Sequence, residues 1–307
     1  MNQETDTSIL FQPAAIATLA NRHAIDDLRI FFASLQLWNV NLPPVYMYCC
    51  SEVLSYLDKE IPYKGPLFCK VVLDAYSKLD RSNMEQLPSE NGLTNLFHDF
   101  TQEKCDLMDW ALKSLPEHES EKGVLFCDAD LCWLGPLPSI PNGKTLGLSP
   151  HGIHPNDEAL YGTYNAGLVW MNDRAYPSLW KQACKHSRFF EQAALENLDD
   201  LTDEQQIYRF GQEHNYGWWR LFQSPNGIAY QKSKWSILQS KDHSGLLVDK
   251  KPVSCIHTHW KTRDSMTMTF NHWMFEKLGA IRSSNPKVEL LLNTISITRN
   301  RISSKKK

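Results

Sequence analysis

The stretch GVLFCDADLCWL, residues 123–134, joins an apolar run to two aspartates that stand two residues apart. The apolar residues predict a buried strand with Asp128 and Asp130 at its end. Because residues i and i+2 of a strand point to one face, both carboxylates can reach one ligand, and a divalent cation relieves their mutual repulsion. Oxygen ligands suit Mg²⁺ or Mn²⁺, so the stretch predicts a metal-bound diphosphate; the alternative is two solvated turn residues. Cys127 and Cys132 are expected to pack in the core.

Strands and helices alternate on both sides of this stretch. Short apolar runs predict further strands at 14–20, 43–50, 64–76, 145–150, 164–172 and 252–260. Apolar residues at helical spacing predict helices at 24–39, 100–114, 177–198, 201–214 and 268–281, with N-caps at Thr101 and Thr202. This alternation predicts an α/β domain with a mostly parallel sheet, which binds ligands at the carboxyl ends of its strands. We place the domain at residues 1–285 and a C-terminal appendage at 286–307.

The bulk composition argues against several classes of protein. A net charge of −3 makes a nucleic-acid-binding protein unexpected, because such proteins carry a basic excess. The first residues, MNQETDTSIL, lack the basic and apolar regions of a signal peptide, and no run approaches the ~18 apolar residues of a membrane span. We therefore expect a cytoplasmic protein whose eight cysteines are reduced.

The end of the chain is basic and carries no acidic residue. Its positive charges are Arg299, Arg301 and Lys305 to Lys307. Such a segment predicts at most a peripheral contact with an anionic membrane; the alternative is a disordered, solubilising end.

Four motifs follow one another in a fixed order. They are GVLFCDADLCWLGPLP (123–138), GTYNAGLVWMND (162–173), LTDEQQIY (201–208) and CIHTHW (255–260). In this order they resemble nucleotide-sugar-dependent glycosyltransferases of the GT-A fold, including family 8-like and bacterial-type enzymes. The resemblance implies a Rossmann-like GT-A domain that transfers a sugar from a UDP- or GDP-sugar to a hydroxyl of a glycan or other acceptor. The chain reads HTHWKTRD where family 8-like enzymes end in H-x-x-G-x-x-K-P-W, which leaves the retaining or inverting outcome open.

The resemblance also implies a role for each residue of the metal site. Asp130 would bind the metal directly, and Asp128 would contact both the ribose and the metal. His257 and His259 alternate along the late strand, so that one is a third metal ligand or both contact the diphosphate. We favour His259 as the ligand and His257 as the diphosphate contact; the alternative is an ordinary polar strand face.

Two further groups of residues are candidates for the reacting centre. Asn165, Ala166 and Gly167 open a strand, where small residues let the donor sugar approach the backbone and the Asn165 amide binds sugar hydroxyls. One carboxylate of Asp203 and Glu204 is expected to take the proton of the acceptor hydroxyl. The alternatives are a simple turn for the first group and an acidic helix start for the second.

The remaining candidates surround the predicted donor. They are Thr18 and Asn21 for the nucleoside, Lys104 for a phosphate or the base, His151 for donor or acceptor, and Trp218, Trp219 and Arg220 for an aromatic acceptor wall. Core packing or a solvated face is the alternative for each of them.

Two other functions are compatible with the motifs. A sugar-1-phosphate nucleotidyltransferase has a related sheet, but it needs a glycine-rich basic loop after the first strand, and TLANRHAID lacks one. A non-catalytic protein that binds a nucleotide sugar would keep the fold alone.

Overall fold

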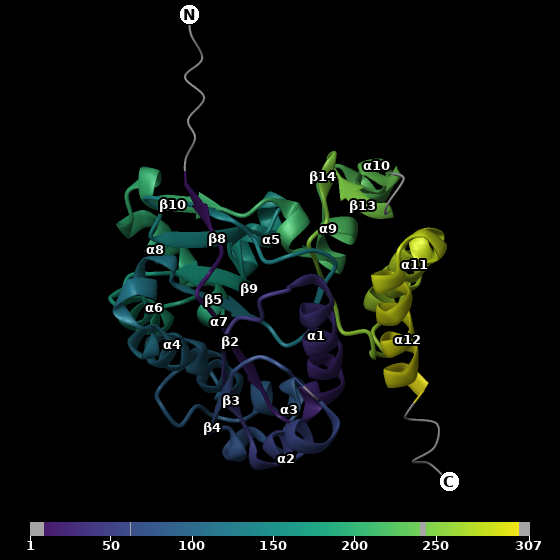
Figure 1. The fold of residues 1–307 in the computed structure, drawn as a ribbon. Helices are drawn as coiled ribbons and strands as arrows, with labels where there is room; N and C mark the ends of the chain where they lie inside the picture. The colour runs from purple at the N-terminus through teal and green to yellow at the C-terminus, as the bar shows by residue number, and fades with distance from the viewer. Residues whose placement is uncertain (1–8, 62, 240–243, 301–307) are drawn as a thin grey trace, which may run out of the picture.

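The computed structural model describes residues 9–61, 63–239 and 244–300. Its centre is a seven-stranded sheet in which β9 runs antiparallel to both of its neighbours and the other strands run parallel to one another. The strands lie in the order β10 (Ile207–Arg209), β8 (Leu146–Pro150), β9 (Tyr164–Met171), β5 (Val124–Cys127), β2 (Ala15–Ala20), β3 (Val45–Cys49) and β4 (Leu67–Val71). The predicted α/β fold with a mostly parallel sheet is therefore confirmed (Figure 1).

The inner strands are apolar on both faces. All six residues of β2, AIATLA, are buried, and β2 pairs in parallel with both β3 and β5. A strand that is covered on both sides needs a continuous apolar sequence. Asn21 follows β2 and Asp128 follows β5, so polar side chains collect at the carboxyl edge of the sheet.

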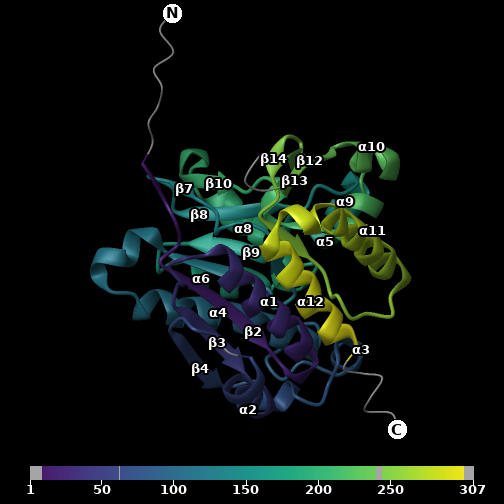
Figure 2. The ribbon, with the colours of Figure 1, turned by 45° about the vertical axis from the view of Figure 1, so that its right-hand side comes forward.

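Helices α1 (Ile25–Trp38) and α4 (Leu96–Ser114) lie on opposite sides of the sheet (Figures 1 and 2). The predicted N-cap of α4, Thr101, is wrong. The helix begins at Leu96, more than one turn before Thr101. Its N-cap is Asn95, whose side chain accepts a hydrogen bond from the His98 N–H. Thr101 lies inside the helix, where its hydroxyl donates to the His98 carbonyl.

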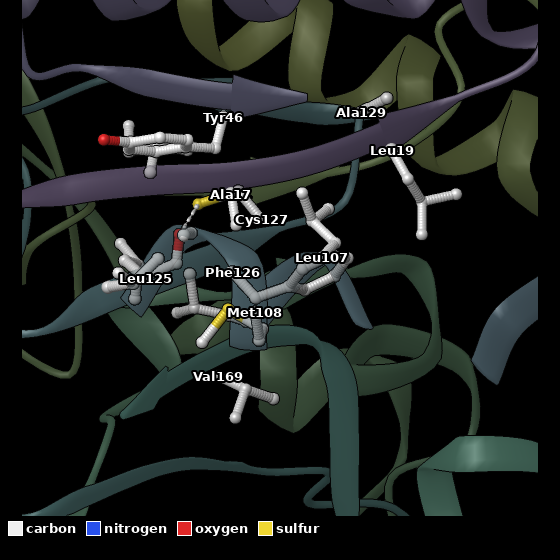
Figure 3. Packing of buried hydrophobic residues seen from close by; sticks show 14 of the residues in the cluster. Ala17, Leu19, Tyr46, Leu107, Met108, Leu125, Phe126, Cys127, Ala129 and Val169 are labelled. Carbon is white, nitrogen blue, oxygen red and sulfur yellow. Dashed lines mark hydrogen bonds between the residues drawn. The ribbon is translucent and has the colours of Figure 1, made fainter. Parts of the chain in front are cut away.

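The core between α4 and the sheet is tightly filled. Figure 3 shows Leu107 and Met108 of α4 beside Phe126 and Val169 of the sheet, and all four are fully buried. Cys127, the next residue of β5, is fully buried on the opposite face of the sheet, and its Sγ lies 3.9 Å from the Leu125 carbonyl oxygen. Cys132 is also fully buried, so both cysteines pack in the core as predicted.

The other helices before residue 265 are short. They are α2 (Ser51–Glu60), α3 (Arg81–Gln86), α5 (Pro155–Tyr161), α6 (Tyr176–Cys184), α7 (Phe190–Ala193), α8 (Leu195–Leu201), α9 (Trp218–Phe222), α10 (Gly227–Ser233) and the 3₁₀ turns Arg22–Ala24, Asp74–Tyr76, Glu117–Lys122, Glu204–Gln206, Gln212–His214 and Arg282–Ser284. Of these, α2, α3, α5, α9 and α10 were not predicted from the sequence.

The predicted helix at 201–214 is wrong. Thr202 follows the end of α8, and β10 runs parallel to β8 as the edge strand of the sheet. The β-branched and aromatic residues Ile207 and Tyr208 pair there with Leu146 and Gly147. Tertiary pairing therefore overrides the local helical spacing. The predicted helix at 177–198 is likewise divided into α6, α7 and α8.

A second apolar cluster lies beside the main sheet and includes residues of α11 (Ser265–Ile281) and α12 (Pro286–Asn300). Helix α12 packs along α1, as Figure 2 shows. The accompanying strands are β6 (Leu131–Trp133), β11 (Tyr216–Gly217) and β15 (Cys255–His257) in one small sheet, β12 (Trp235–Gln239), β13 (Ser244–Val248) and β14 (Lys251–Pro252) in another, and the pair β1 (Leu10–Phe11) and β7 (Ile140–Pro141).

Within the described part of the chain, no helix has both the length and the apolar character to cross a bilayer. None of the eight cysteines, all of which lie in the described ranges, forms a disulfide. Of the basic C-terminal segment, Arg299 lies in α12, whereas Arg301 and Lys305 to Lys307 lie outside the described residues.

Candidate functional site

A cleft of about 670 Å³ opens at the carboxyl edge of the sheet. Its lining runs from Asn21 after β2, past Asp128 after β5 and Asn165 on β9, to His151 after β8. These four strands are neighbours in the sheet, so the cleft crosses about three strand spacings of ~4.8 Å, or roughly 14 Å.

The two aspartates lie in a turn between β5 and β6, at the centre of the cleft. Three backbone hydrogen bonds hold this turn. The Asp128 N–H donates to the Gly167 carbonyl (2.9 Å), the Leu131 N–H to the Asp128 carbonyl (3.2 Å) and the Thr258 N–H to the Asp130 carbonyl (3.1 Å). The sequence DAD is thus fixed on three sides, by β9, by its own turn and by the segment after β15.

Asp128, Asp130 and His257 form a cluster that could hold a metal ion. One potential ligand atom from each lies within 4.8 Å of those of the other two. His257 Nε2 is 3.1 Å from Asp130 Oδ1 and 3.9 Å from Asp128 Oδ2. Two carboxylates and one imidazole are a donor set that suits Mn²⁺ better than Mg²⁺.

The structure does not place His259, the predicted third ligand, in this cluster. β15 ends at His257, so the alternation on which the prediction depended does not continue to His259. Its Nδ1 instead lies 2.8 Å from Asp27 Oδ2, and its Nε2 lies 3.5 Å from Asp130 Oδ2. The negative charge of Asp130, together with that of Asp27, raises the pKa of His259 to about 10 although burial opposes this.

The pKa values of the two aspartates shift in opposite directions. Burial raises the pKa of Asp128, and the nearby Asp130 charge adds to this rise against the opposing effect of Lys104. Burial also acts to raise the pKa of Asp130, but the charges of His257 and His259 hold it well below its usual range. Such opposed shifts in one cleft are typical of a functional site.

Gly167 leaves the space in which these ligands meet. A Cβ atom on Gly167 would collide with His257 Cε1 and would lie only 2.8 Å from Asp128 Oδ2. The absence of a side chain at this position on β9 therefore keeps the ligand cluster open. Ala166 and Asn165 precede it on the same strand and also line the cleft.

Lys104 is buried in an ionic cluster under the turn. Its Nζ lies 3.0 Å from Asp128 Oδ1, 2.7 Å from Glu191 Oε1 and 3.4 Å from the Ala166 carbonyl oxygen. Although burial opposes ionisation, the charges of Asp128 and Glu191 raise the pKa of Lys104 above its usual range. Lys104 is thus engaged by two carboxylates and a carbonyl and orients Asp128, whereas the sequence predicted a contact with a phosphate or the base.

Glu191 and Gln192, on the short helix α7, were missed by the sequence analysis. The residue before them, Phe190, has a φ of 45°, an uncommon left-handed conformation that directs the start of α7 toward the cleft. Gln192 Oε1 accepts hydrogen bonds from Asn165 Nδ2 (3.3 Å) and the Ala166 N–H (3.4 Å). The acid–amide pair EQ beside aromatic residues was the available signal, but it lay inside a segment predicted as one continuous helix.

Asn215 was also missed, and no local pattern indicates it. It is fully buried between the 3₁₀ turn Gln212–His214 and β11. Its Oδ1 lies 3.0 Å from His257 Nδ1, and its Nδ2 donates to Asn165 Oδ1 at 2.9 Å.

At the β2 end, Asn21 lines the cleft, whereas Thr18, the other residue predicted to contact the nucleoside, does not. The Asn21 amide already donates toward the Tyr76 and Leu79 carbonyls, and its Oδ1 accepts from the His23 N–H. Thr18 is fully buried within β2.

At the β8 end, His151, Trp218 and Trp219 line the cleft. Trp219 lies between two histidine rings, 4.9 Å from that of His257 and 5.7 Å from that of His151. Arg220 is buried behind them, and its guanidinium bonds to the Asn215 and Pro150 carbonyls. Arg220 therefore supports the wall and is not part of the cleft lining.

The structure does not bring Asp203 and Glu204 to the cleft. They precede β10, whose amino end lies at the opposite edge of the sheet, because β10 is parallel to β8. Both are exposed, and Glu204 forms an ion pair with Arg209 at 2.6 Å. Both carboxylates therefore lie outside the cleft, in contrast to the catalytic role that the sequence predicted.

Comparison with known proteins finds no matching family model and no matching curated protein. Solved structures similar to this chain include the glycosyltransferase GlyE of Streptococcus pneumoniae TIGR4 (TM-score 0.46, 14% identity, 95% of this chain and 64% of that chain). They also include mouse xyloside xylosyltransferase 1 (0.45, 13%, 81% and 98%) and the galactosyltransferase LgtC (0.46, 11%, 87% and 96%). The chain spans only 64% of the length of GlyE. All three of these proteins are glycosyltransferases.

Proposed function

We propose that the protein is a metal-dependent glycosyltransferase that moves a hexose or pentose from a UDP- or GDP-sugar to a hydroxyl of a glycan or another acceptor. The observation that carries this proposal is the Asp128–Asp130–His257 cluster at the centre of the cleft. Two carboxylates held this close repel each other, and a divalent cation removes that cost. We assign the activity to residues 1–285.

The order of the strands suggests how the donor lies. The nucleoside would bind at the β2 end beside Asn21, the diphosphate at Asp128 and Asp130, and the sugar against Asn165 and Gly167 on β9. An extended nucleoside diphosphate sugar would then cross the sheet edge from β2 toward β8, where the acceptor would meet its reacting end.

Different residues of the cleft would bind the cation, position Asp128 and orient the transferred sugar. Asp128, Asp130 and His257 would hold the cation, which stabilises the charge that develops on the departing diphosphate. Lys104 keeps Asp128 in position through their 3.0 Å ion pair. Asn165 would orient the hydroxyls of the transferred sugar, because positioning of the reacting groups lowers the barrier to transfer.

A thermal-shift screen tests this function directly. UDP- and GDP-sugars are added with and without Mn²⁺, and we expect one donor to raise the melting temperature only when Mn²⁺ is present. A ligand at about 100 times its Kd adds roughly 2.7 kcal/mol to the free energy of unfolding. Slow, Mn²⁺-dependent hydrolysis of the same donor separates an enzyme from a protein that only binds nucleotide sugars. A screen without any metal-dependent shift would contradict the proposal.

The β8 end of the cleft has the chemistry of a site for a neutral sugar acceptor. His151 Nδ1 lies 3.1 Å from the Gly162 carbonyl, which can only accept, so Nδ1 carries the proton and Nε2 carries a lone pair. His151 would therefore accept a hydrogen bond from an acceptor hydroxyl. The half-buried indole of Trp218 lines the same end and offers an apolar face on which a sugar ring can pack.

The protonation of His151 should make the free energy of unfolding depend on pH. Burial lowers the pKa of His151 to about 4, whereas an unfolded histidine titrates near ~6.5. Between these two values the unfolded chain binds the proton and the folded chain does not, so the free energy of unfolding falls as the pH is lowered through this window. We expect His151→Gln to lose less stability than the wild type between pH 7 and pH 4, by up to about 3 kcal/mol. Urea unfolding curves at both pH values measure this, and parallel losses would contradict it.

A further inference from the structure

Four amide and imidazole side chains, three of them buried and Gln192 half-buried, form one chain of hydrogen bonds along the wall of the cleft. It runs from His257 on β15 through Asn215 and Asn165 to Gln192 on α7. Gln192 Nε2 donates to the Tyr161 carbonyl at 2.7 Å, which ends the chain. These hydrogen bonds thus connect residues from four separate segments of the chain.

Backbone groups fix the direction of every bond in this chain. The Gly167 N–H, which can only donate, bonds to Asn165 Oδ1 at 3.0 Å. Asn165 Nδ2 must therefore donate to Gln192 Oε1, and Gln192 Nε2 to the Tyr161 carbonyl, which can only accept. A reversed amide at Asn165 would set two N–H groups against each other.

The same constraint fixes Asn215. Because Asn165 Oδ1 is an acceptor, Asn215 must present its Nδ2 to it, and the second hydrogen of that Nδ2 donates to Ser149 Oγ at 3.0 Å. Asn215 Oδ1 is then the atom that faces His257 Nδ1 at 3.0 Å. An oxygen there requires a proton on Nδ1.

We infer that Asn215 is a positioning residue that keeps a proton on His257 Nδ1, so that Nε2, 3.1 Å from Asp130 Oδ1, is the ring atom left to bind a cation between Asp128 and Asp130. A metal-binding histidine generally donates its other N–H to an oxygen, which fixes the ring and its tautomer. Asn215 supplies that oxygen, and Asn165 in turn ties it to the part of the cleft proposed for the donor sugar. The inference rests on the metal site of the proposed function.

Three variants of the full chain separate this role from a merely structural one. Asn215→Leu removes the oxygen and should weaken Mn²⁺ binding about 10- to 100-fold. Asn215→Asp keeps an acceptor opposite Nδ1 and should recover part of that affinity, because its second oxygen replaces the donor to Asn165 Oδ1. Ser149→Ala removes another partner of the same Asn215 amide but leaves Oδ1 on His257, so its Mn²⁺ affinity should stay within about threefold of the wild type.

The readouts are the Mn²⁺ dissociation constant, from the electron paramagnetic resonance signal of free Mn²⁺, and the ¹⁵N spectrum of labelled histidine in the Mg²⁺-loaded wild type. We expect a His257 signal with a protonated Nδ1. A protonated Nε2, or a folded Asn215→Leu that binds Mn²⁺ as tightly as the wild type, would overturn the inference. The ¹⁵N spectrum decides the question even where Asn215→Leu does not fold.

Asp130→Asn distinguishes the failure of this inference from that of the proposed function. One possible outcome is that the wild type and Asn215→Leu both bind Mn²⁺ whereas Asp130→Asn does not. The metal site is then supported, and only the role of Asn215 is overturned. If the wild type binds no Mn²⁺, the proposed metal site and the inference both fail.

Discussion

Asp130→Asn should lower the rate of Mn²⁺-dependent sugar transfer at least about 1,000-fold, which corresponds to roughly 4 kcal/mol of transition-state stabilisation. The substitution keeps the size of the side chain and removes the charge that faces His257 Nε2 at 3.1 Å. The cation would lose a carboxylate ligand and with it the means to stabilise the departing diphosphate. Transfer and donor hydrolysis, measured with the donor identified by thermal shift, together with the Mn²⁺ dissociation constant, check this result.

The matched controls for this variant are Asp203→Asn and Glu204→Gln. Both remove an acidic charge from a position that the motif comparison suggested as catalytic, but the structure places both at the opposite edge of the sheet. We expect each to keep activity within about twofold, since exposed substitutions away from such features usually change little. A large loss of activity in either control, or full activity in Asp130→Asn, would contradict the site. The melting temperature of Asp130→Asn excludes loss of folding as the cause.

Lys104→Met should have the largest effect on stability. It leaves Asp128 and Glu191 without their shared cation, although both lie within 3.0 Å of Lys104 Nζ and Glu191 is almost completely buried. Removing one partner of a buried ion pair typically costs about 3–5 kcal/mol, because the remaining charge is uncompensated. Urea unfolding at pH 7 measures the loss.

Lys181→Met is the control for this substitution. Lys181 also forms an ion pair with an acid of α4, Asp106, at 2.6 Å, but both side chains are more than 40% exposed. Exposed pairs contribute about 0–1 kcal/mol, so this variant should be close to the wild type. If Lys104→Met costs no more than Lys181→Met, the buried cluster does not stabilise the fold.

The pH dependence of Lys104→Met gives a second test of the same cluster. Although burial opposes it, the charge of Lys104 lowers the pKa of Glu191. Glu191 therefore contributes stability above its unfolded pKa of ~4.3, and this contribution is lost as the pH falls. The difference in free energy of unfolding between the wild type and Lys104→Met should narrow below about pH 5. The double variant Lys104→Met/Glu191→Gln should also be more stable than Lys104→Met alone.

The apolar runs of the chain predicted most of the central sheet, because a strand covered on both faces has few alternatives to an unbroken apolar sequence. AIATLA and YNAGLVWM are fully buried strands, and the aspartates of CDADLC lie at the edge of the sheet where the pattern places them. The short helices around the cleft were predicted less well. In the segment 190–209, packing at the edge of the sheet decides between helix and strand, and local spacing does not report it.

By itself, then, the sequence determined that two carboxylates end a buried strand and that a ligand cleft should lie there, because strand alternation and the cost of buried charge are local properties. Only the tertiary structure decided which residues join them. His257 meets Asp130 through the pairing of β15 with β6, and Lys104, Gln192 and Asn215 arrive from segments far apart in the chain. Hydrogen bonds and ion pairs between distant segments depend on how the elements pack, and no spacing within a single segment encodes them.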